Sequence, residues 1–211
     1  MKTTRDYAQD DIPLRDAVEY WESEKRQMQT QIPFGNDKQM EQTTGNAASG
    51  RTFTLRDGVV VEAPVERCFR LSTSIEVVGS TLEMRVVEGR LGGMILAGDR
   101  LVWRGWKFGL PQMHETLITA FEEPNGNGRA FFQDTMGQGR FATFQHDHRF
   151  TSVEGGTLLE DELRFSMPLG WAGEMVGRLV MVPHIRGLLR KRFALLKELA
   201  EGDGWRRYVC E

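Results

Sequence analysis

The sequence predicts an α+β fold in which a curved antiparallel sheet of six or seven strands packs against one long C-terminal helix. Two observations lead to this prediction. From residue 51 onward, short segments of alternating apolar and polar residues follow one another, separated by turns rich in glycine. From about residue 170 the apolar residues recur every three or four positions, which is the period of an amphipathic helix.

Composition restricts the broad class of protein. The chain has 211 residues, of which 40% are hydrophobic and 27% charged, and a formal net charge of −3. Proteins that bind duplex nucleic acid usually have a basic domain, so nucleic acid is not an expected partner. No apolar run approaches the roughly 18 residues that indicate a membrane-spanning helix, and no secretory signal is recognisable. Because two cysteines make no disulfide framework, the expected location is the cytoplasm.

Residues 1–50 differ in composition and pattern from the rest of the chain. A helix is expected where apolar residues step by three or four from Leu14 through Trp21 to Ile32, and the polar segment after it is typical of a linker. The helix could pack on the main domain or bind a protein partner, whereas its acidic face would be repelled by anionic lipid. We expect that deleting residues 1–45 leaves a folded core, which the melting temperature of the truncated protein would test.

The main domain is expected over residues 51–202, with 203–211 as a C-terminal tail. A first strand, interrupted by a turn at Asp57-Gly58, should lead into a short helix around residues 63–71. The final helix, 170–201, should end before Gly202 and be kinked near Pro183, because proline lacks the amide donor. Between the two helices, strands are expected at roughly 83–89, 99–109, 113–122, 129–137, 141–153 and 157–167.

Strand parity predicts which side chains face the helix, because alternate residues of a strand share one face. On the 141–153 strand, His146 and His148 share a face with two phenylalanines. Extending the parity to the neighbouring strands and adding helix positions gives the predicted lining of a cavity: Trp103, Phe132, Asp134, Met136, Phe144, His146, His148, Phe150, Asp161, Leu163, Phe165, Met175 and Leu179.

The ionisable members of this set need partners, because burying an unpaired charge is costly. We expect His146 or His148 to pair with Asp134 or Asp161 on an adjacent strand, and the pKa of the paired histidine to be raised. Three interpretations remain open: a polar network that fixes the core, an anchor for the polar group of an apolar ligand, or general acid–base catalysis by His146, His148 and Asp161. The His-X-His spacing is by itself a weak metal signal, so neither a metal nor another cofactor is expected.

Several segments resemble the START-like (SRPBCC) superfamily, which contains polyketide cyclases/dehydrases and lipid-transport proteins and has the helix-grip fold. The resemblance rests on the order and spacing of residues 63–69, 98–109, 144–150 and 155–162, and it extends over about 51–201. It is closest to a bacterial subgroup of ligand-binding proteins. The resemblance implies a cavity between sheet and C-terminal helix, in which some members bind lipids, sterols or quinones and others cyclise or dehydrate polyketides.

The function expected from these observations is binding of a small hydrophobic molecule, such as a lipid, quinone, sterol or polyketide-like compound. The alternative is a cyclase or dehydratase that uses a His/Asp pair in the same cavity. A third hypothesis is an interaction module that recruits a partner through the N-terminal helix or through the basic C-terminal face, which includes Arg190, Lys191 and Arg192.

Overall fold

The computed structural model of the chain describes residues 50–209. The predicted N-terminal helix and nearly all of the linker therefore lie outside the described residues, and the effect of deleting residues 1–45 stays a prediction. Among the residues described, no helix is long and apolar enough to cross a membrane.

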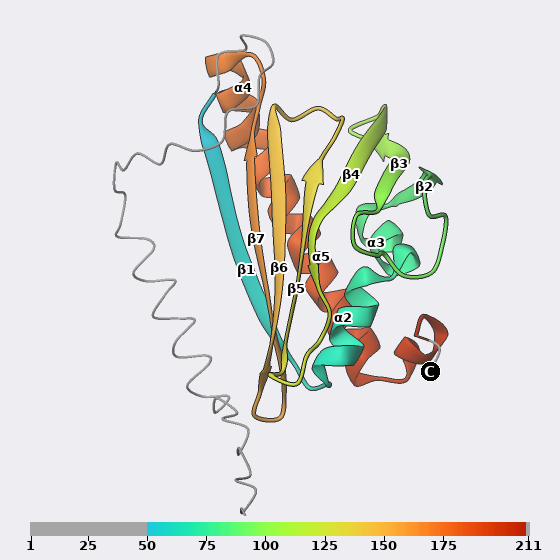
Figure 1. Cartoon of the computed structure of the whole chain (residues 1–211). Helices are drawn as coiled ribbons and strands as arrows, with labels where there is room; N and C mark the ends of the chain where they lie inside the picture. Colours follow the sequence, from blue (N-terminus) through green and yellow to red (C-terminus); the bar gives the residue numbers. More distant parts are fainter. Residues whose placement is uncertain (1–49, 210–211) are drawn as a thin grey trace, which may run out of the picture.

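Seven strands form one antiparallel sheet in the order β1-β7-β6-β5-β4-β3-β2. Strands β2 to β7 follow one another as a meander, and β1 closes the sheet against β7, as Figure 1 shows. The prediction of a curved antiparallel sheet is confirmed, and most strand ends lie within a few residues of those predicted. The strands are β1 (Thr52–Val61), β2 (Met84–Glu88), β3 (Arg100–Lys107), β4 (Leu110–Glu122), β5 (Arg129–Met136), β6 (Thr143–Val153) and β7 (Gly156–Ser166).

The turn predicted at Asp57-Gly58 is wrong. Strand β1 continues through it, with Asp57 opposite Asp161 and Gly58 opposite Glu160 of β7. Ten consecutive residues of β1 pair with β7, so the ladder of backbone hydrogen bonds outweighs the local preference of an Asp-Gly pair for a turn.

Two short helices, α2 (Val65–Thr73) and α3 (Ile75–Leu82), lie between β1 and β2. Helix α2 was predicted, but α3 was not. The sequence of α3 is rich in β-branched residues and contains Gly79, a composition that favours strands or turns. Its helical form buries Ile75, Val77 and Thr81 in the core, and this burial overrides the weak local preference.

The C-terminal helix runs from Gly170 to Glu201 across the sheet, as predicted (Figure 1). It consists of α4 (Gly170–Val176), a π-helical stretch η1 (Gly177–Met181) and α5 (Val182–Glu201). The irregularity therefore lies just before Pro183, about one turn earlier than predicted. The proline lacks an amide donor and its ring crowds the preceding turn, which accounts for the wider π turn there.

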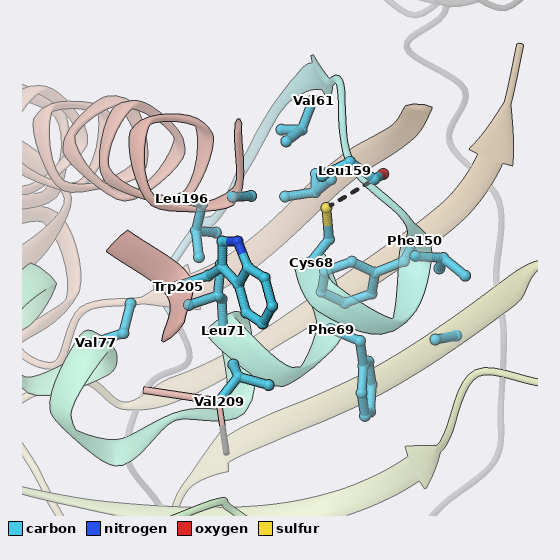
Figure 2. Packing of buried hydrophobic residues seen from close by; sticks show 14 of the residues in the cluster. Val61, Cys68, Phe69, Leu71, Val77, Phe150, Leu159, Leu196, Trp205 and Val209 are labelled. Atoms are coloured by element: carbon cyan, nitrogen blue, oxygen red, sulfur yellow. Dashed lines mark hydrogen bonds between the residues drawn. The ribbon is translucent and has the colours of Figure 1, made fainter. Parts of the chain in front are cut away.

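The largest core cluster packs α2 and α5 against the sheet (Figure 2). Trp205 and Val209, from the segment that we set apart as a tail, are buried in this cluster beside Leu196. A short 3-10 helix, η2 (Gly204–Arg207), carries Trp205 into it. Cys68 lies in the same cluster, where burial raises the pKa of its thiol to about 11 and keeps it protonated.

Candidate functional site

The ionisable side chains converge on the face of the sheet that α5 covers. His146 and His148 point to the same side of β6, and both are buried. Asp134 of β5 lies opposite His146 in the strand register, and Asp161 of β7 lies opposite His148. Adjacent strands thus bring each carboxylate beside an imidazole, as strand parity predicted.

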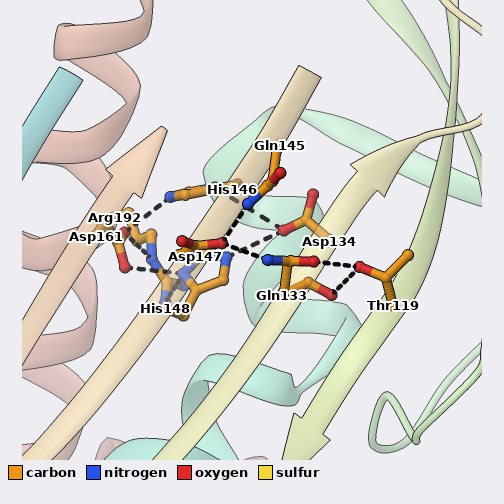
Figure 3. Close-up of polar contacts among 9 residues, drawn as sticks. All are labelled: Thr119, Gln133, Asp134, Gln145, His146, Asp147, His148, Asp161 and Arg192. Atoms are coloured by element: carbon orange, nitrogen blue, oxygen red, sulfur yellow. Dashed lines mark hydrogen bonds and ion pairs between the residues drawn. The ribbon is translucent and has the colours of Figure 1, made fainter. Parts of the chain in front are cut away.

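His148 bridges the two carboxylates (Figure 3). Its Nδ1 lies 2.8 Å from Oδ1 of Asp161, and its Nε2 lies 3.1 Å from Oδ2 of Asp134. An ionised carboxylate can only accept hydrogen bonds, so these two contacts favour the protonated imidazolium, whereas Nη2 of Arg192, itself a donor 3.1 Å from Nδ1, opposes it. Burial alone would lower the pKa of His148, but Asp161 and Asp134 outweigh it and raise that pKa.

Arg192 of α5 completes the network by donating from Nε to Oδ2 of Asp161 at 2.8 Å. The sequence analysis placed Arg192 in a basic surface patch, and this is wrong, since only 8% of its side chain is exposed. The helical period could have revealed it, because Arg192 is three residues after buried Leu189 and four before buried Leu196. Although burial opposes ionisation, Arg192 and then His148 hold the pKa of Asp161 well below its usual value.

His146 differs from its neighbour in charge. Burial and the positive charge of His148 lower its pKa, although Asp161 and Asp134 act in the opposite direction. Its Nε2 lies 3.4 Å from Oδ2 of Asp161 but forms no hydrogen bond. His114 of β4 also has a lowered pKa, mainly because it is buried. Burial therefore favours the neutral form of His146 and His114, whereas the two carboxylates favour the charged form of His148.

The network borders a cavity with two compartments. The outer one has a volume of about 380 Å³ and lies between the β3–β4 hairpin and the C-terminal helix. The inner one, about 100 Å³, lies between α2, α3 and strands β3 to β6. Both are lined by Thr81, Leu82, His114, Phe144, His146 and Arg192, so they adjoin at the polar network. A larger open depression of about 890 Å³ over α3 and β2 contains none of the network residues.

Seven of the predicted lining residues border the two compartments: Trp103, Phe132, Asp134, Phe144, His146, His148 and Leu163. Asp161 joins them through its hydrogen bonds to His148 and Arg192. The ring of Phe132 stacks on that of His148, with centroids 4.1 Å apart. Phe150 and Phe165 are packed in core clusters and Met136 is half-buried; none of these three lines either compartment.

Met175 and Leu179 point away from the cavity, with exposed fractions of 51% and 65%, so placing them in its lining is corrected. The helix instead buries Gly173 against Met167 and Pro168, and Gly177 against the sheet. A Cβ atom at Gly177 would lie 2.5 Å from the ring of Phe53 on β1, so only a glycine permits this approach. The prediction for the C-terminal helix used apolar residues only, and it therefore missed a contact face made of glycines.

Asp134, His146 and His148 offer ligand atoms that lie within 4.8 Å of one another, which is close enough for a metal ion. The rest of the network does not favour one. A cation bound there would have to displace the Nε2 proton of His148, and it would add positive charge beside Arg192, whose Nη2 is 3.1 Å from Nδ1 of that ring. The site is therefore better described as a set of groups that donate and accept protons than as a metal site.

Comparison with known proteins finds solved structures that have a similar architecture. No protein-family model matches the chain, and no curated protein matches it in sequence. Among solved structures, TTHA0849 from Thermus thermophilus is similar, with 19% identity, a TM-score of 0.53, and coverage of 69% of this chain and 94% of that one. Norcoclaurine synthase from Thalictrum flavum has 11% identity, a TM-score of 0.53 and coverage of 77% and 96%.

A protein of Staphylococcus aureus, SA2116, is similar at 10% identity, with a TM-score of 0.53 and coverage of 72% and 98%. At these identities the likeness concerns the fold. In each of these structures the shared architecture spans nearly the whole protein, and in this chain it spans 69% to 77%. The chain therefore has the helix-grip fold that its sequence resemblance implied.

Proposed function

We propose that the protein binds a small hydrophobic molecule in the cavity between the sheet and α5. The observation that carries the proposal is the pairing of an outer, mainly apolar compartment with an inner one bordered by the His/Asp/Arg network. Removing apolar surface from water would contribute about 25 cal/mol per Å² before the costs of association. A lipid, quinone, sterol or polyketide-like compound in the cytoplasm is the expected class of ligand.

A strained residue at the mouth of the outer compartment supports the proposal. Phe108 and Gly109 form the two-residue turn between β3 and β4, with φ angles of +53° and +73°. Such turns favour asparagine, aspartate or glycine, and a bulky residue there is strained. Phe108 is exposed, lines the outer compartment and contacts the ring of His184 with centroids 4.8 Å apart. The strained backbone thus holds an apolar ring at the mouth of the compartment, where it can contact an entering apolar ligand.

The test combines native mass spectrometry with a matched pair of variants. We expect a small molecule to co-purify with the full chain and to be released on unfolding. Val180 lines the outer compartment and its neighbour Leu179 does not. Val180→Trp should therefore displace the molecule and weaken binding of an apolar fluorescent probe, whereas Leu179→Trp should leave both unchanged. Equal effects of the two variants, or none, would contradict the proposal.

A second candidate function is acid–base catalysis on a ligand in the same cavity. It is favoured by His146, whose lowered pKa keeps the ring neutral beside the hydrogen-bonded pair of His148 and Asp161, so that it can accept a proton. The norcoclaurine synthase structure, solved with dopamine and hydroxybenzaldehyde, is a case of small aromatic molecules bound to a protein of this fold. His146→Gln should abolish turnover of a polycarbonyl substrate while leaving its binding intact; retained turnover would exclude this role.

A further inference from the structure

The inner compartment is lined by residues whose polar atoms the protein leaves without partners. Within residues 50–209, three buried side-chain atoms form no hydrogen bond: Oγ of Ser72, Nε1 of Trp103 and Nε2 of His146, the last of which lies 3.4 Å from Oδ2 of Asp161. All three residues line the inner compartment, which they reach from α2, β3 and β6. Because an unpaired buried polar atom costs about 1–3 kcal/mol, their gathering around one small space indicates a polar occupant.

The types of these atoms restrict the occupant. The indole nitrogen of Trp103 can only donate a hydrogen bond, so the occupant must offer an acceptor. The hydroxyl of Ser72 can donate or accept, and therefore suits either a carbonyl or an alcohol. The space of about 100 Å³ exceeds the roughly 10–15 Å³ that one water needs, so a small polar end group fits there.

The charges around the compartment restrict the occupant further. The negative charges of Asp134 and Asp161 are opposed by Arg192 and by the protonated form of His148, and hydrogen bonds join the four groups into one network (Figure 3). A carboxylate or an amine brought into this buried site would be an unbalanced charge, which costs several kcal/mol. A neutral oxygen would instead accept a hydrogen bond and add no charge.

We propose that the ligand enters with a neutral oxygen acceptor foremost, as in a ketone, aldehyde, ester, quinone or alcohol, and leaves its apolar body in the outer compartment. This inference rests on the proposed binding function and narrows its ligands to uncharged molecules. Trp103 donates the hydrogen bond to the ligand oxygen. A ligand that is a carboxylate in water enters only after taking up a proton.

Isothermal titration calorimetry of the full chain with 2-acetylnaphthalene, 2-naphthoate and 2-ethylnaphthalene tests the inference, because the three probes share one apolar body. At pH 7.5 the ketone should bind at least about tenfold more tightly than either of the other two. Between pH 8 and pH 6 the affinity for the ketone should stay constant. The affinity for naphthoate should rise about tenfold per pH unit, with one proton taken up per ligand in buffers of different ionisation enthalpy.

Two tryptophan variants supply the matched control. Trp103→Phe removes the donor and should weaken ketone binding about tenfold, with no effect on 2-ethylnaphthalene. Trp205→Phe, in the core cluster away from the cavity, should change neither affinity. Ser72→Ala gives the same test should Trp103→Phe fail to fold, with 2-naphthalenemethanol as the probe.

The outcomes separate the two proposals. Naphthoate binding as tightly as the ketone without proton uptake would overturn the neutral-ligand inference and leave the binding function standing. An unchanged ketone affinity in Trp103→Phe would also overturn it, as would an unchanged affinity of Ser72→Ala for 2-naphthalenemethanol where Trp103→Phe does not fold. If none of the probes binds more tightly than about 1 mM, the proposed binding function fails and this inference fails with it.

Discussion

The buried pair of Asp161 and Arg192 should make a large, coupled contribution to stability. Their side chains are only 2% and 8% exposed, and Nε of Arg192 lies 2.8 Å from Oδ2 of Asp161. Asp161→Asn would leave the buried guanidinium of Arg192 without this carboxylate, and Arg192→Met would leave the carboxylate of Asp161 without this guanidinium. Removing one partner of a buried pair typically costs about 3–5 kcal/mol, against about 0–1 kcal/mol for an exposed pair.

The double variant removes both charges of the pair, so neither is left buried without its partner. We therefore expect the double variant to lose at least about 2 kcal/mol less than the sum of the single losses. Urea unfolding of the four proteins measures this coupling. The partly exposed pair of Lys197 and Glu201 on the same helix is the matched control, with an expected coupling of about 0.3–0.5 kcal/mol. Additive losses at Asp161 and Arg192 would refute the reasoning.

Three further predictions concern the titrating histidines, the helix glycines and the strained turn. His148 has a raised pKa, so it stabilises the fold most at pH values below the pKa of the unfolded state, and this stabilisation is lost as the pH rises through the folded-state pKa. His146 has a lowered pKa, so the fold loses stability as the pH falls below the pKa of His146 in the unfolded state. In urea unfolding from pH 5 to 9, His148→Gln should thus be most harmful at acid pH, whereas His146→Gln should lessen the acid loss; parallel profiles would contradict this. Gly177→Ala should cost about 1–3 kcal/mol, whereas Gly187→Ala, whose Cβ meets nothing within 4 Å, should stabilise by about 0.5–1 kcal/mol; equal melting temperatures would refute it. Phe108→Asn should raise stability by about 1 kcal/mol by relieving the positive φ yet weaken binding of apolar probes, and unchanged probe affinity would remove the residue from the binding function.

The sheet could be predicted from the sequence because turn residues mark where most of its strands begin and end. The turns that separate β4 to β7 are short and glycine-rich, and the alternation along β6 is enough to place His146 and His148 on one face. The pairing of imidazoles with carboxylates followed from the cost of burying charge. The identity of the paired histidine did not follow, because it depends on which ring lies between both carboxylates.

The parts that escaped prediction depend on tertiary contacts. Arg192 follows two other basic residues, so its charge suggested the surface, but its position on the helix face is set by the core. Gly177 carries no apolar signal and lies inward because the backbone there contacts an aromatic ring. Trp205 follows the end of a helix, where a tail is the simplest interpretation, yet it fills the core cluster beyond Leu196.

These contacts together explain how the cavity can stay open in a folded core. At one end, Gly177 brings the helix close to Phe53 of β1; at the other, Arg192 is bonded to Asp161 of β7. The fifteen steps between Gly177 and Arg192 span about 22 Å at 1.5 Å per residue. Along this span the helix lines the outer compartment through residues such as Ile185 and Leu189. Because the ends fix the distance between helix and sheet, side chains along the span can change the shape of the cavity without moving the helix.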